Sequence, residues 1–184
     1  ETAALFAGLQ IAEHKNIMEK WQGKYPVVSI SFKSLRSKTF EQFKTDLKIA
    51  IFECYQSYTY LKTSTKLKQE EKDKIQMYFE RDFDDSGFTY SLKYLTEMLK
   101  KHHDKYVVVL IDEYDMPLQE AYLHGFFDQA IEPFRNMLGE VLKGNEYLYK
   151  GIVTGITRIA KESLFSGVNN LDVYDITRNK YAEY

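Results

Sequence analysis

The hydrophobic pattern of the chain alternates between strand-like and helix-like stretches. Residues 27–32 read VVSISF, a β-branched and apolar run that is typical of a strand. Residues 106–111 read YVVVLI and have no polar position to turn toward solvent. We expect such a strand to be buried on both faces, as in a parallel sheet covered by helices. Residues 147–154 predict another apolar strand that ends at Thr154.

Between the strands, apolar residues recur every three or four positions, which predicts helices. The clearest helix spans residues 40–58, where Thr39 and Gln42 form a capping box and Cys54 lies on the apolar face. Residues 84–87 predict a turn. The other predicted elements are helices over residues 69–83, 92–101, 127–141 (with Pro133 inside the pattern) and 158–165, and a short strand over 173–176. Strands separated by helices indicate right-handed crossovers and a three-layer α/β fold with a parallel sheet.

Composition and charge narrow the class of protein. The 184 residues fit one domain, because domains usually have about 100–200 residues. A formal net charge of −2 excludes a generally basic nucleic-acid binder, although a local basic patch remains compatible with it. The single Cys54 excludes an internal disulfide framework and fits a reducing, cytoplasmic compartment. No apolar run approaches the ~18 residues of a membrane span, so we expect no membrane partner.

Candidate chemistry begins where the most apolar strand ends. Asp112 and Glu113 follow it directly, and Asp115 lies two positions further on. Ligands of open α/β sheets bind at the carboxyl ends of the strands. A carboxylate there can hold Mg²⁺ through water, and a neighbouring Glu can orient or deprotonate an attacking water. The alternative is that these residues are only a polar turn between a buried strand and solvent.

A second candidate lies after the strand that ends at Thr154. If this strand lies beside residues 107–111, Thr154 and Arg158 share a crevice with the three carboxylates. Thr154 can then position the water, and the planar guanidinium of Arg158 can stabilise charge on a terminal phosphate. The alternative reading is that Thr154 merely ends a strand and that Arg158 forms a surface ion pair.

Three segments together resemble a known family. They are YPVVSISF (residues 25–32), VLIDEYDMPLQEAY (109–122) and GIVTGITRIAKESLFSGVNNLDVYDIT (151–177). The chain resembles, over essentially its whole length, the AAA-ATPase-like domain, a P-loop NTPase that often precedes a PD-(D/E)XK nuclease-like domain. The resemblance implies a Walker B motif at residues 107–113, with Asp112 organising Mg²⁺, Glu113 catalytic and Asp115 in a supporting, nucleotide-site role. It also makes Thr154 a sensor-like residue with Arg158 nearby.

The resemblance also implies partners and a larger protein. ATP and Mg²⁺ are the expected cofactors, a nucleotide is the expected partner, a homo-oligomer is open, and any nucleic-acid contact is expected through a separate domain. The sequence contains no G-x-x-x-x-G-K-[ST] phosphate-binding loop, and Gly23-Lys24-Tyr25 lacks the needed hydroxyl. We therefore expect residues 1–184 to be a partial domain whose Walker A strand and loop lie upstream. The family continues beyond residue 184, and we expect this fragment alone to bind ATP-Mg weakly or not at all.

Other functions stay open at this stage. A scaffold domain without catalysis is the main alternative. A nuclease that uses Asp112, Glu113 and Asp115 is a third possibility, although its Asp…Glu-x-Lys pattern is not evident. His102, His103 and Asp104 predict a solvated helix end, and the Tyr-rich stretch over residues 55–60 predicts packing rather than base stacking.

Overall fold

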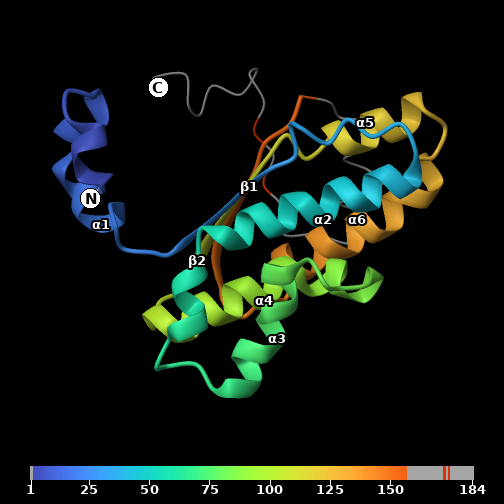
Figure 1. The fold of residues 1–184 in the computed structure, drawn as a ribbon. Helices are drawn as coiled ribbons and strands as arrows, with labels where there is room; N and C mark the ends of the chain where they lie inside the picture. Colours follow the sequence, from blue (N-terminus) through green and yellow to red (C-terminus); the bar gives the residue numbers. More distant parts are fainter. Residues whose placement is uncertain (1, 157–171, 173, 175–184) are drawn as a thin grey trace.

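The computed structural model describes residues 2–156, 172 and 174. The helix expected over residues 158–165 and most of the strand expected over 173–176 lie outside the described residues. The elements, in chain order, are the 3-10 turns η1 (Thr2–Phe6) and η2 (Gln10–Glu13), α1 (Lys15–Trp21), β1 (Val27–Ser31), α2 (Phe40–Gln56), η3 (Thr59–Thr63), α3 (Gln69–Glu80), α4 (Asp85–His103), β2 (Val107–Asp112), α5 (Met116–Leu123), α6 (Phe127–Leu142) and β3 (Leu148–Val153). Figure 1 shows their arrangement.

The sheet consists of three parallel strands in the order β1-β2-β3, which makes β2 the central strand. Its register pairs Ser31 with Asp112 and Ile111 with Val153. Helices α2 to α4 connect β1 to β2, and helices α5 and α6 connect β2 to β3. The predicted α/β fold, a parallel sheet among helices, is therefore confirmed.

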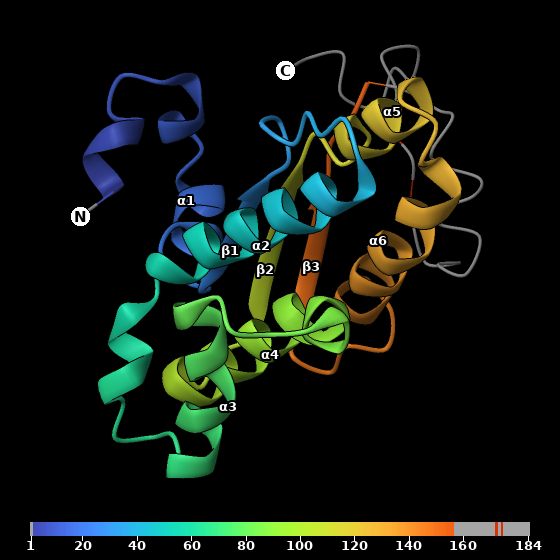
Figure 2. The same ribbon diagram turned by 45° about the vertical axis from the view of Figure 1, so that its right-hand side comes forward.

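Helices α2, α4 and α6 pack together over the sheet (Figures 1 and 2). Burial alternates along the strands: Val28 and Ile30 of β1 are buried, while Ser29 between them is exposed. In β2, Val109 is buried but its neighbour Leu110 is only half-buried. The expectation that both faces of this strand are buried is thus not met among the described residues, because the apolar core lies on the helix-covered side.

The start of α2 follows the predicted capping box with one change. The Thr39 hydroxyl accepts a hydrogen bond from the Gln42 backbone N–H at 3.2 Å. The Gln42 side chain accepts the backbone N–H of Lys38 rather than that of Thr39, at 3.1 Å. Both bonds satisfy donors at the start of the helix, as a capping box does. Cys54 packs in the core as predicted, with 7% of its surface exposed.

The turn predicted at residues 84–87 is instead the first turn of α4. The Asp84 carboxylate accepts the backbone N–H of Gly87 at 3.1 Å and the Ser86 hydroxyl at 2.6 Å. These hydrogen bonds, with that from Ser86 the largest cause, lower the pKa of Asp84. Asp, Ser and Gly favour helix starts as well as turns, so the local sequence signal was ambiguous. Helix α4 is therefore longer than predicted.

Candidate functional site

The carboxyl ends of all three strands meet at Asp112. Asp112 is the last residue of the central strand β2, and its side chain is exposed. The Thr154 hydroxyl, just after β3, donates to Oδ1 of Asp112 at 2.5 Å. The Ser31 hydroxyl, at the end of β1, donates to Oδ2 at 3.3 Å. One carboxylate is thus held between two hydroxyls from the neighbouring strands.

The parallel register explains this arrangement. Because the strands run in the same direction, their last residues lie at one edge of the sheet. The structure confirms the condition that places Thr154 in this crevice, since β3 lies beside β2. Ser31 was missed by the sequence analysis, although the polar residue closing VVSIS was a usable signal once the strand order is known.

The backbone at Glu113 takes an unusual conformation. Its φ angle is 51°, in the left-handed region that non-glycine residues rarely adopt. The backbone on either side of Glu113 is hydrogen-bonded to Thr154, at the end of β3. The Thr154 N–H donates to the Ile111 carbonyl at 2.8 Å, and the Tyr114 N–H donates to the Thr154 carbonyl at 3.1 Å. Asp112 and Glu113 therefore form a bulge, with Glu113 half-buried beside Asp112.

Glu113→Gly is expected to stabilise the fold by about 0.5–1.5 kcal/mol, because glycine adopts a positive φ without the steric cost of a Cβ. Asp104→Gly is the matched control, since Asp104 has a φ of 53° at the exposed end of α4, before β2 begins, whereas the bulge lies where β2 ends. Urea unfolding measures both variants. A loss of stability in Glu113→Gly alone would contradict the view that this backbone is strained.

Asp115 is fully buried and ties the loops after β2 and β3 together. Its Oδ2 accepts the backbone N–H of Ile156 at 3.0 Å and the Gln119 side-chain amide at 2.7 Å. Gly155 passes close to Asp115 and Tyr114. A Cβ added to Gly155 would lie 2.6 Å from both Oδ1 of Asp115 and the Tyr114 ring. Burial, followed by the Asp115 carboxylate, raises the pKa of Tyr114. Asp115 therefore positions the segment that begins at Thr154.

Two further predictions concern Arg158 and a bound metal ion. Arg158 lies outside the described residues, so its role stays a prediction. Within the described residues, no group of three or more His, Cys, Asp or Glu side chains forms a metal-binding cluster. The donor set at Asp112 fits Mg²⁺ none the less, because Mg²⁺ keeps several waters and is often held by only one or two carboxylates.

A parallel α/β sheet with polar side chains at the carboxyl ends of its strands belongs to the class of open α/β folds, whose ligands bind at that edge. The model of the AAA-ATPase-like family, described as "Predicted AAA-ATPase", matches residues 1–165. The chain belongs to this family, and ATP and Mg²⁺ are the ligands that such a family implies in general. No helix among the described residues is long and apolar enough to cross a membrane.

One relative was found among curated proteins. It is a protein of Azotobacter chroococcum mcd 1 described as "Uncharacterized protein in vnfD 5'region", and it is 31% identical over 80 residues. The match covers 41% of this chain and 16% of the relative, so the chain corresponds to a small part of that protein. No solved structure matches the chain.

Proposed function

We propose that this chain is the acidic and sensor part of an ATP-hydrolysing site. The observation that carries the proposal is the contact of Thr154, Asp112 and Ser31 at one edge of the sheet. A hydroxyl on each side orients the Asp112 carboxylate before any ligand arrives. Such preorganisation is what phosphoryl transfer requires, since that reaction depends mainly on positioning and electrostatics.

Each residue has a proposed role in this site. Asp112, at the end of the Walker B segment 107–113, would hold Mg²⁺ through water. Mg²⁺ held there would supply positive charge that offsets the charge developing on the transferring phosphate. Glu113 accepts a proton from the attacking water, and its bulged backbone places it next to Asp112. Thr154 orients that water as a sensor residue, Arg158 stabilises charge on the terminal phosphate, and Asp115 supports the site by holding the loop of Thr154.

We propose that the part of the site that binds the phosphates, the Walker A strand and loop, lies upstream of Glu1. The sequence has no Walker A loop, whose backbone N–H groups and Lys normally cradle the phosphates. Among the described residues β3 pairs only with β2, and Ile152 on it is 45% exposed. An exposed apolar edge of this kind suits a further strand. We propose that the Walker A strand of the longer protein pairs there.

Asp112→Asn is expected to weaken ATP-Mg binding about tenfold in a chain that includes the upstream loop, because it removes the charge that holds the hydrated metal. Isothermal titration calorimetry with and without Mg²⁺ measures the effect. Asp82→Asn, an exposed carboxylate just beyond α3, is the control and should bind as the wild type does. Equal Mg²⁺-dependent affinity in the Asp112 variant would overturn the proposal and favour a scaffold without catalysis.

A further inference from the structure

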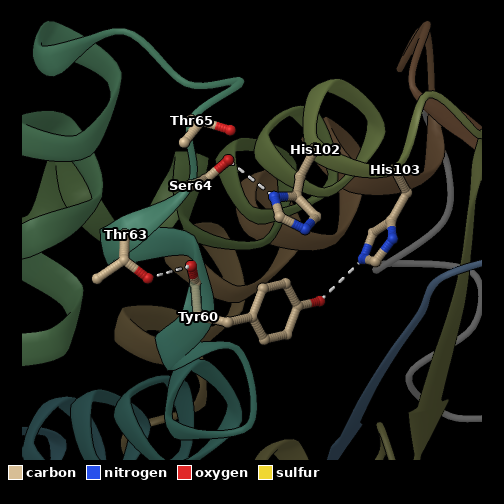
Figure 3. A pocket seen from close by; sticks show the side chains of 6 residues that line it. All are labelled: Tyr60, Thr63, Ser64, Thr65, His102 and His103. Atoms are coloured by element: carbon tan, nitrogen blue, oxygen red, sulfur yellow. Dashed lines mark hydrogen bonds between the residues drawn. The ribbon is translucent and has the colours of Figure 1, made fainter.

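A polar cavity lies at the end of α4, on the side where β2 begins. Its volume is about 510 Å³, it is open to solvent, and its lining consists of hydroxyl and imidazole side chains (Figure 3). The lining residues are Tyr60, Thr63, Ser64, Thr65, His102 and His103. Because β2 runs from here toward Asp112, the cavity and the proposed ATPase site lie at opposite ends of that strand.

The local charge differs from that of the whole chain. Residues 60–68 and 100–106 supply the cavity and its surroundings, and they contain six Lys and one acid, Asp104, in a chain of net charge −2. Asp104 pairs with Lys100 at 3.3 Å. Lys101 is bound by two Glu side chains, and the Lys62 ammonium lies 4.3 Å from the centre of the Phe79 ring. This cavity is therefore in a basic region of the surface.

Lys66 and Lys105 stay available for a ligand. Neither forms a salt bridge to another described residue, and both side chains are exposed. Their charges reach the cavity: burial first, then His102, Lys66 and Lys105, lower the pKa of His103. The charges of Lys66 and Lys105 thus act on the side of the cavity formed by His103.

The hydrogen bond between Ser64 and His102 leaves the second ring nitrogen of His102 facing the cavity. The Ser64 hydroxyl oxygen accepts the Lys66 backbone N–H at 3.2 Å and lies 2.8 Å from Nδ1 of His102. When the Ser64 O–H donates to Nδ1, Nε2 of His102 is the ring nitrogen that carries a hydrogen. Figure 3 shows this second nitrogen turned toward the space between Tyr60 and His103. In this tautomer His102 presents an N–H donor to that space.

His103 and Tyr60 form the opposite wall. The Tyr60 hydroxyl lies 3.0 Å from Nε2 of His103, and the two ring centres are 5.8 Å apart. Among the residues that the structure describes, no carboxylate lines the cavity. The imidazole nitrogens that face Ser64 and Tyr60 are already hydrogen-bonded, which disfavours a metal ion. The His102 ring and the Thr65 hydroxyl, with the ammonium groups of Lys66 and Lys105 near the cavity, instead suit an anion with several acceptor oxygens.

We propose that this cavity binds a phosphate group, with His102 and Thr65 as its contacts and the nearby charges of Lys66 and Lys105 attracting it. The phosphate can belong to a small phosphate ester or to the backbone of a single-stranded nucleic acid, since both present the same oxygens. The proposal does not rest on ATP hydrolysis, because it uses none of the residues at the carboxyl ends of the strands.

The test is an NMR titration of the four His side chains with inorganic phosphate at pH 7. His102 and His103 are expected to shift and saturate together, and the pKa of His103 to rise in the bound state because an anion favours its charged form. His14 and His124 are built-in controls that should not move. Equal shifts in all four His residues, or no saturation, would overturn the proposal.

Charge variants sharpen the test without touching the core. Lys66→Gln and Lys105→Gln are each expected to weaken phosphate binding about 3- to 10-fold, as loss of a charge-assisted contact does. Lys15→Gln, on exposed α1, is the matched control and should leave affinity unchanged. Unchanged affinity in both lysine variants would contradict the role of these two charges in attracting the phosphate.

Two further ligands identify the source of the phosphate. Glycerol phosphate that competes for the same His102 and His103 shifts indicates a small ester. A short oligothymidylate that binds more tightly than phosphate, with the same dependence on Lys66 and Lys105, indicates a nucleic-acid backbone. Tighter binding of Ni²⁺ than of any phosphate at His102 and His103 would make the cavity a metal site and overturn the proposal.

Discussion

Glu113→Gln is expected to leave ATP-Mg binding intact and to reduce ATP turnover about 10²- to 10⁴-fold, in a chain that includes the upstream phosphate-binding loop. The glutamine amide has nearly the size of the carboxylate but cannot accept the proton of the attacking water. Binding is retained because the proposed metal contact belongs to Asp112. Phosphate release under saturating ATP, with calorimetry for affinity, measures the two effects separately.

Glu132→Gln is the control for this prediction. Glu132 lies on the exposed face of α6, within the same connection between β2 and β3. The Glu132→Gln variant should therefore hydrolyse ATP as fast as the wild type. Wild-type turnover in Glu113→Gln would remove Glu113 from the mechanism. If binding is retained but the wild type itself releases no phosphate, the scaffold alternative replaces the ATPase proposal.

Asp115→Ala is expected to have the largest effect on stability, about 2–3 kcal/mol, or a fall of roughly 5–10 °C in Tm. The substitution removes a buried carboxylate and leaves the N–H of Ile156 and the Gln119 amide without the group that they bind at 3.0 and 2.7 Å. It also opens a gap next to Gly155. Thermal unfolding followed by circular dichroism measures the change.

Two matched variants separate burial from charge. Asp82→Ala removes an exposed carboxylate and should change Tm by little. Asp115→Asn keeps an acceptor oxygen for Ile156 and should recover part of the loss. Because Asp115 acts by positioning the loop of Thr154, its Asn variant should also recover turnover more than the Ala variant does. A Tm for Asp115→Ala equal to that of the wild type would contradict the tie between the loops.

Much of the fold was predictable because its signals are local. The apolar run before Asp112 predicts a strand whatever surrounds it, and the Thr39 cap predicts where α2 begins. The local sequence does not decide the structure of residues 84–87, because Asp84 can start a turn or a helix. The packing of α4 on α6 favours the helix. The burial of β2 on one face likewise depends on which helices cover it.

The candidate site divides in the same way. The sequence by itself determined that polar residues follow two apolar strands, and hence that Asp112, Glu113 and Thr154 are candidates for chemistry. Only the tertiary structure decided that β1 and β3 flank β2, which brings Ser31 and Thr154 onto one carboxylate, and that Asp115 is buried. It also brought His102 and His103 to Ser64 and Tyr60, a contact between segments about forty residues apart. Strand order and long-range packing arise from burial summed over the whole chain, which no short motif encodes.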